Sequence, residues 1–214
     1  MDWTPLLVAF GVFLFSLSVH ESAHALTARW LGDDTGYLLG RITLNPVPHI
    51  DPVGTLLLPA ILLYTTNGQM VFGWAKPVPY QPFALRNPFL GSAAVAAAGP
   101  VSNFLLALLS AVLLGFTTRN GMGVTLGHQV LVSLLFLNVV LGLFNLLPLP
   151  PLDGGTIVGG LLPRRASAAW AHMDSLGPVI LLVLLATHTL DRVLSVGVDA
   201  VVGQLYGVVR GIRG

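Results

Sequence analysis

The chain has 214 residues, of which 54% are hydrophobic and only 9% are charged, and its formal net charge is +1. Soluble domains usually carry about 25% charged residues, so a soluble globule of this length would have too few charges to cover its surface. The composition therefore predicts a polytopic membrane protein. No basic cluster with interleaved aromatic residues occurs, so we expect no nucleic-acid partner. The absence of cysteine excludes disulfides and thiolate ligands, which leaves His, Asp and Glu to bind any metal.

The first apolar segment runs from about Pro5 to Leu31 and contains His-Glu-Ser-Ala-His at residues 20–24. It lacks a basic start and a small-residue cleavage site, which predicts a retained helix and not a signal peptide. On a helix, His20 and His24 share a face and can bind one metal ion. Glu21 points elsewhere but stays close enough to activate water, as in the H-E-x-x-H pattern of zinc proteases. The pattern also arises by chance on soluble helices, but ionisable side chains inside a membrane segment are costly and usually functional.

Further apolar segments predict a mainly α-helical transmembrane bundle, organised as a single integral-membrane domain over residues 1–214 with its core at about 5–165. The polar stretch from Gly36 to Pro48 is expected to be loop or strand, and Asn67-Gly68 predicts a turn. The residues from Ser195 to Ile212 are amphipathic and are expected to lie at the membrane interface. The remaining expected elements are an apolar segment from His49 to about Thr66, spanning helices at about Gly91–Phe116 and Leu126–Leu147, a short helix opening at Asp153, and a last apolar segment from Leu176 to Leu190.

The segment from Val71 to Tyr80 differs from the rest of the chain because it is aromatic, β-branched and interrupted by proline. This composition predicts an extended edge strand, which would form a small membrane-embedded β element in the bundle. Irregular or extended backbone is tolerated at membrane depth only when it is buried in protein or faces a water-filled cavity. We therefore expect residues 73–77 to lie beside the active site.

The basic residues predict the orientation of the chain in the membrane. The positive-inside rule places the N-terminus outside and the level of His20 and Asp153 toward the cytoplasm. Arg41 and Arg86 are both inside only if the intervening chain crosses the membrane an even number of times, as a helix with an extended return or a re-entrant loop would do. Six basic residues fall on the expected inner side, namely Arg29, Arg41, Lys76, Arg86, Arg164 and Arg165, whereas Arg119 and Arg192 fall on the other.

A catalytic zinc ion generally has three protein ligands, so the two histidines need a third, most simply a carboxylate. Among the nine acidic residues, only Asp153 lies amid a long uncharged stretch, after a proline cluster and before two glycines. Asp153 as a mere N-cap of the following helix is the plainer alternative. His49 and Asp51 are the second candidate pair, although they look more like interfacial loop residues.

The combination of H20-E-S-A-H24 with Asn145-Leu-Leu-Pro148-Leu-Pro-Pro-Leu-Asp153-Gly154 resembles the site-2 protease family of intramembrane zinc metalloproteases. The chain looks most like compact bacterial members, since no PDZ or cystathionine-synthase-type (CBS) domain is present. The resemblance implies that His20, His24 and Asp153 bind one zinc ion per chain and that Glu21 is the catalytic base. Further likeness lies in Asn45-Pro46, in residues 73–79 (GWAKPVP) and in residues 98–103 (AGPVSN).

Two asparagines complete the expected site by resemblance. Asn145 is similar to the family asparagine that helps to bind the substrate carbonyl, and Asn103 occupies a motif position that is associated with the same task. An asparagine amide could donate to a developing oxyanion, although a helix–helix hydrogen bond is the plainer alternative for Asn145.

The expected function is therefore hydrolysis of peptide bonds in transmembrane or membrane-associated proteins, as in regulated intramembrane proteolysis. The expected partners are a transmembrane protein substrate and membrane lipid, and the expected location is a bacterial cell membrane. Two alternatives are a membrane metal transporter or sensor, and a non-proteolytic scaffold. A transporter would need ligands repeated along a path, whereas this chain offers one cluster with glutamate in the base position.

Overall fold

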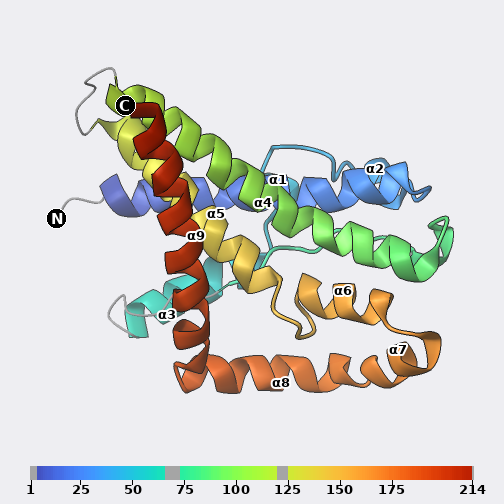
Figure 1. The fold of residues 1–214 in the computed structure, drawn as a ribbon. Helices are drawn as coiled ribbons and strands as arrows, with labels where there is room; N and C mark the ends of the chain where they lie inside the picture. Colours follow the sequence, from blue (N-terminus) through green and yellow to red (C-terminus); the bar gives the residue numbers. More distant parts are fainter. Residues whose placement is uncertain (1–3, 66–72, 120–124, 214) are drawn as a thin grey trace.

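A computed structural model of the chain describes residues 4–65, 73–119 and 125–213, and these residues are mostly helical (Figure 1). Four helices, α1, α4, α5 and α9, are long and apolar enough to cross a membrane, and a fifth span arises if α7 and α8, bent by 51°, are one unit. The long elements are α1 (Thr4–Trp30), α4 (Pro88–Arg119), α5 (Leu126–Asn145), α8 (Met173–Ala186) and α9 (Thr189–Arg213). The short ones are α2 (Thr35–Leu38), η1 (Val47–His49), η2 (Pro52–Leu57), α3 (Leu58–Thr65), η3 (Pro82–Ala84), α6 (Asp153–Leu161) and α7 (Arg164–Trp170).

Helix α4 extends beyond both ends of the helix expected at about Gly91–Phe116. Its first residue is Pro88, and the Asn87 side chain accepts hydrogen bonds from the backbone N–H groups of Phe89 and Leu90. Proline suits the first helical position because its missing N–H would have no partner there, and asparagine is a favoured cap. The helix then runs through Pro100 as one element. It is therefore long enough to reach α1, α5, α6 and α9, all of which it contacts.

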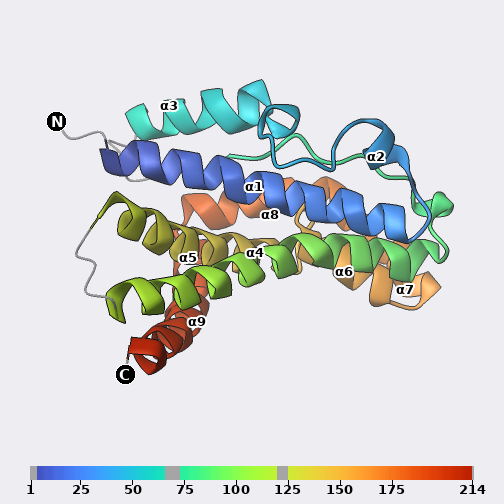
Figure 2. The same cartoon turned by 90° about the horizontal axis from the view of Figure 1, so that it is seen from above.

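Small residues allow the spanning helices to pack closely around α4. Ala107 is fully buried against Val139 of α5 and Val198 of α9, and Ala111 is buried in a second cluster with Leu135. Helices in membranes associate mainly through such close packing, because lipid is as apolar as their own side chains. Figure 2 shows α1 lying between α3 on one side and α4 with α5 on the other.

The C-terminal region forms one continuous helix, α9, where an amphipathic interfacial segment was expected from Ser195 to Ile212. In Figure 1, α9 crosses α4 and α5 obliquely, and its contacts with both helices agree with this view. A side chain at Gly115 of α4 would meet Ile212, with a Cβ–Cβ distance of 2.8 Å. Packing against two spanning helices therefore determines where this segment lies.

The expected strand from Val71 to Tyr80 is wrong for the residues that the structure describes. Residues 73–81 have no regular secondary structure, and no strand occurs in residues 4–65, 73–119 or 125–213. A strand needs a partner strand for its backbone groups, but these donors have other acceptors. The N–H of Trp74 donates to the Gly54 carbonyl and that of Lys76 donates to the His49 carbonyl.

The apolar segment expected from His49 to about Thr66 forms a short helix. The Asp51 side chain accepts hydrogen bonds from the N–H groups of Val53 and Gly54 and so caps η2, which continues directly into α3. Together Pro52–Thr65 form an apolar helix that is shorter than the four spanning candidates. The expected turn at Asn67-Gly68 lies outside the described residues.

Candidate active site

The two histidines of the H-E-x-x-H pattern are buried on the face of α1 that packs against α4. The Nδ1 atom of His20 lies 2.7 Å from Oδ1 of Asn103, and the Nδ1 atom of His24 lies 2.7 Å from the Val95 carbonyl oxygen. The remaining ring nitrogens face each other, with the two Nε2 atoms 3.0 Å apart. One turn of helix thus brings two imidazoles to one point, as the spacing predicts.

Asp153 comes to the same point from the first turn of α6. Its Oδ2 atom lies 3.2 Å from Nε2 of His20, and its Oδ1 atom lies 3.5 Å from Nε2 of His24. The N-cap position of α6 belongs to Leu152, and no side chain caps the helix. The plainer alternative, in which Asp153 is only an N-cap, is therefore wrong. The backbone packs closely at the glycine that follows Asp153, because a Cβ on Gly154 would collide with the Leu147 carbonyl oxygen.

The three side chains have the chemistry and spacing of a zinc site. Each histidine Nδ1 lies beside an oxygen that can only accept, so each ring carries its proton there and presents a lone pair at Nε2. The buried Oδ2 of Asp153 has no hydrogen-bond partner. Three acceptors facing one another repel unless a cation lies between them. Ligand atoms 2.0–2.1 Å from a tetrahedral ion would be about 3.3–3.4 Å apart, close to the separations of 3.0, 3.2 and 3.5 Å found here.

The floor of this site lies against Gly99 of α4. A Cβ at this position would lie 2.5 Å from Cε1 of His20 and 2.5 Å from Nε2 of His24. Real Cβ atoms do not approach other heavy atoms so closely, so a residue without a side chain is needed where α4 passes the imidazoles.

Glu21 lies on a different face of α1 from the histidines, beside the irregular segment 73–81. Its Oε2 atom accepts a hydrogen bond of 3.0 Å from the backbone N–H of Val78. The guanidinium of buried Arg41 donates to the carbonyl oxygens of Pro48 and, at 3.1 Å, of Pro77, and so holds the same segment in place. The general-base candidate is thus positioned by irregular backbone that is held by individual hydrogen bonds from side chains and from other main-chain groups.

A cleft of about 410 Å³ joins these two faces. His20, Glu21, His24 and Asp153 all line it, and Asn145 lines it from the last residue of α5. The other lining side chains are mostly apolar and include Phe13, Leu17, Trp74, Val78, Leu141, Phe144 and Leu181. Three side chains that could hold a metal ion, with a further carboxylate beside them in one largely apolar cleft, are what metal-assisted hydrolysis requires.

The two expected asparagines are placed differently. Asn145 faces the cleft, and its Nδ2 donates one hydrogen bond of 3.0 Å to the Leu141 carbonyl oxygen, which leaves its second amide hydrogen for another acceptor. Asn103 is fully buried behind His20 and does not line the cleft. It therefore contacts His20 and cannot reach a substrate in the cleft. A third buried asparagine, Asn138, bonds to Asn103, and nothing in the sequence singled it out.

The second candidate pair does not form a metal site. Buried His49 donates from Nε2 to the Thr43 carbonyl oxygen at 3.1 Å, and Asp51 caps a helix. Within the described ranges, the only group of three or more His, Asp or Glu side chains that could hold a metal ion is His20, His24 and Asp153.

Comparisons with known proteins agree with this geometry. The model of peptidase family M50 matches residues 122–185, which include Asn145 and Asp153. The chain is 39% identical over 197 residues to a Bacillus subtilis protein named as the zinc metalloprotease YwhC, which covers 88% of this chain and 86% of that protein. It is 35% identical over 184 residues to a Mycolicibacterium smegmatis protein named as the zinc metalloprotease Rip2, which covers 84% of this chain and 67% of that protein.

A Mycobacterium tuberculosis protein of the same name is 32% identical over 188 residues, which cover 84% of this chain and 66% of that protein. No solved structure matches the chain significantly. The relatives confirm the resemblance to the site-2 protease family and favour proteolysis over metal transport, metal sensing or a scaffold role. The chain belongs to peptidase family M50 and is a multi-pass membrane zinc metalloprotease.

Proposed function

We propose that His20, His24 and Asp153 hold a single zinc ion and that Glu21 is the general base for cleavage of peptide bonds in transmembrane proteins. The observation that carries this assignment is the convergence of the three side chains in the cleft that Glu21 also lines: the two Nε2 atoms are 3.0 Å apart, and the two Asp153 carboxylate oxygens lie 3.2 Å from Nε2 of His20 and 3.5 Å from Nε2 of His24. The whole chain forms the proteolytic domain in this proposal.

The residues divide the chemistry between them. Zinc, when bound, lowers the pKa of water and polarises a carbonyl group. Glu21 takes a proton from the attacking water and delivers it to the leaving amine. The Val78 N–H keeps the Glu21 carboxylate in place through its hydrogen bond. Asn145 directs its remaining amide hydrogen at the oxygen of the scissile carbonyl, where negative charge develops.

The substrate is an unwound segment of a transmembrane helix. An intact helix satisfies all its backbone groups internally and hides its peptide bonds, so it must open locally before cleavage. Trp74 and Val78 line the cleft from the irregular segment, and we expect extended substrate to lie against these two residues. Single cysteines at these two positions should crosslink to the cleavage region of a substrate. If these cysteines were labelled from outside the cell and never crosslinked to substrate, residues 73–81 would be an ordinary external loop.

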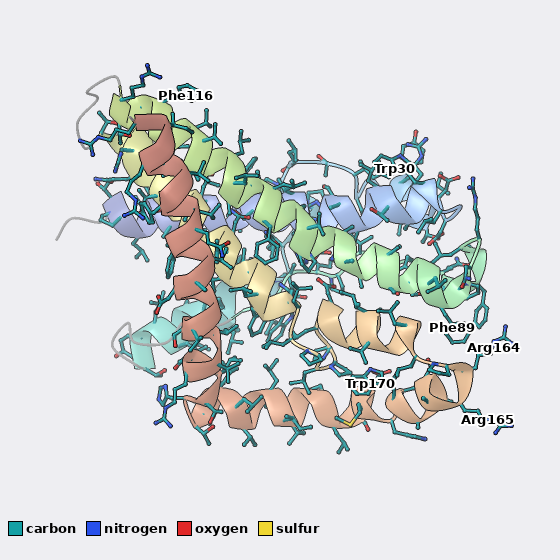
Figure 3. All side chains as sticks on the ribbon, in the orientation of Figure 1. Trp30, Phe89, Phe116, Arg164, Arg165 and Trp170 are labelled. Atoms are coloured by element: carbon teal, nitrogen blue, oxygen red, sulfur yellow. The ribbon has the colours of Figure 1, made fainter. Side chains whose placement is uncertain are left out.

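The end of the bundle that holds the site faces the cytoplasm of the bacterial cell in this proposal. Figure 3 shows Trp30, Phe89, Arg164 and Arg165 at one end and Phe116 at the other. His24 lies six residues before Trp30 on α1, about 9 Å along the helix axis. Tryptophan is typical of either membrane interface, and the clustered arginines indicate the cytoplasmic one. A single cysteine at exposed Ala168 should react with an impermeant thiol reagent only after the inner face of the membrane is opened.

The direct test of the function is cleavage of a model transmembrane substrate by the purified protein in detergent. Cleavage within the membrane segment by the native protein, and none by a Glu21→Gln variant that keeps its zinc, supports the assignment. A native protein that binds zinc but leaves every such substrate intact would contradict it.

A further inference from the structure

Behind the metal site, a chain of buried amides connects His20 to helix α5. The Oδ1 atom of Asn103 lies 2.7 Å from Nδ1 of His20, and Nδ2 of Asn103 donates a 2.8 Å hydrogen bond to Oδ1 of Asn138. Asn138 in turn donates from Nδ2 to the Leu134 carbonyl oxygen at 2.8 Å and to Oγ of Ser16 at 2.8 Å. Asn103, Asn138 and Ser16 are fully buried, and none of them lines the cleft.

The hydrogen bonds that link Asn138, Asn103 and His20 can run in only one direction. The Leu134 carbonyl oxygen can only accept, so the amide atom of Asn138 beside it must be the NH₂ group, and its Oδ1 must face Asn103. That oxygen also only accepts, so Asn103 must turn its own NH₂ toward Asn138 and its Oδ1 toward His20. The proton of the His20 ring then lies on Nδ1, and Nε2 is left with the lone pair that a metal needs.

The two histidines are therefore oriented by different means. The Nδ1–H of His24 donates directly to the Val95 main-chain carbonyl, which cannot rotate. His20 depends on an amide that could rotate by half a turn, and a rotated Asn103 would present NH₂ to Nδ1. The His20 proton would then move to Nε2 and block the metal. The hydrogen bond from Asn103 to Asn138 prevents that rotation.

We propose that Asn138 is a positioning residue that fixes the metal-binding tautomer of His20 through Asn103, with Ser16 and the Leu134 carbonyl oxygen holding Asn138 itself. This inference rests on the proposed role of His20 as a zinc ligand. Groups that orient a ligating histidine typically contribute about 10–100-fold to metal affinity. Asn138 touches neither substrate nor the cleft, so it acts only through the two side chains in between.

The test is a double-mutant cycle read out as zinc affinity, measured by chelator competition on the purified protein. Asn138→Leu should weaken zinc binding by about 10–100-fold in the native background. In an Asn103→Asp background the same change should cost little, because both carboxylate oxygens accept and rotation no longer matters. Ser110→Ala is the control, since it removes a buried polar group of α4 that bonds only within its own helix.

A second readout does not depend on the stability of any variant. Nitrogen NMR of the metal-free native protein with ¹⁵N-labelled histidine should show the His20 proton on Nδ1. An Nδ1 without a proton would overturn the proposal, as would equal losses of zinc affinity from Asn138→Leu in both backgrounds, because a packing role predicts equal losses. If His20 is not a ligand at all, His20→Ala will keep native zinc affinity, which separates that failure from a failure of the amide chain.

Discussion

The two faces of α1 at the active site are built in different ways. His20 and His24 lie against α4 and α6, with Gly99 so close that no side chain fits between. Glu21 lies against residues 73–81, which have no regular structure and are fastened by side chains such as Arg41 and Asp33. The metal face is thus held by packed helices, and the base face by individual hydrogen bonds.

This difference assigns separate tasks to the two faces. A metal site must hold its ligands in a fixed geometry, and packed helices resist small displacements. A substrate helix must enter and unwind, and a segment held by a few polar contacts can yield at modest cost. We therefore expect substitutions on the metal face to change zinc binding, and substitutions on the base face to change cleavage without loss of zinc.

The largest expected effect concerns Glu21, which follows His20 in the sequence but lies on the other face of α1. Glu21→Gln should lower the cleavage rate by about 10²–10⁴-fold, because an amide cannot take the proton of the attacking water. Zinc content should stay native, since Glu21 is not a ligand. Paired measurements of cleavage and bound zinc check this, and a cleavage rate near that of the native protein would refute the role of Glu21.

Asn145 lies in the cleft between the two faces. Asn145→Ala should lower kcat by about 10²–10³-fold, the typical cost of one lost oxyanion donor, with little change in KM or in zinc affinity. Steady-state kinetics with zinc analysis measures the three quantities. If zinc content collapsed while the remaining holoenzyme stayed fully active, Asn145 would have a structural role.

The packing of the metal face can be tested at its floor. Gly99→Ala places a Cβ 2.5 Å from both imidazoles, and such overpacking costs about 1–3 kcal/mol, or roughly 5–150-fold in zinc affinity if the ligands bear it. Gly11→Ala is the matched control, because a Cβ at that position on α1 meets nothing within 4 Å. Equal zinc affinities for the two variants would show that the metal face tolerates displacement.

The smallest expected effect concerns the fastening of the base face. Burial raises the pKa of Asp33, but hydrogen bonds from the Thr35 hydroxyl, the Gln81 N–H and the Thr35 N–H outweigh it, so the net pKa is lowered. The stabilisation is therefore present above the ordinary Asp pKa of about 3.9 and is lost as the pH falls through the lowered value.

Asp33→Asn should remove this acid dependence and cost about 0.5–1.5 kcal/mol, or roughly 2–12-fold faster hydrogen exchange in residues 73–81 at neutral pH. Exchange measured by mass spectrometry checks this, with zinc content as the internal control. Unchanged exchange would show that other contacts hold the segment.

The same difference between the two faces of α1 shows which parts of the site could be predicted from the sequence. The convergence of His20, His24 and Asp153 was predictable because the two histidines share a helical face and because Asp153 stands alone after a proline cluster. The strand expected from Val71 to Tyr80 was wrong because composition does not reveal which acceptors tertiary structure will offer. Asn138 was not found because its task exists only where α1, α4 and α5 meet. A buried amide in a spanning helix was the one available signal.

The central claim is that three side chains from α1 and α6 form one zinc site next to a base that is not a ligand. Metal analysis of the purified protein tests it most directly, with native, Glu21→Gln and Asp153→Ala proteins measured together. We expect about one zinc per chain in the native and Glu21→Gln proteins, on the logic of one ion and three ligands, and loss of zinc from Asp153→Ala. Native zinc content in Asp153→Ala would contradict the site described here.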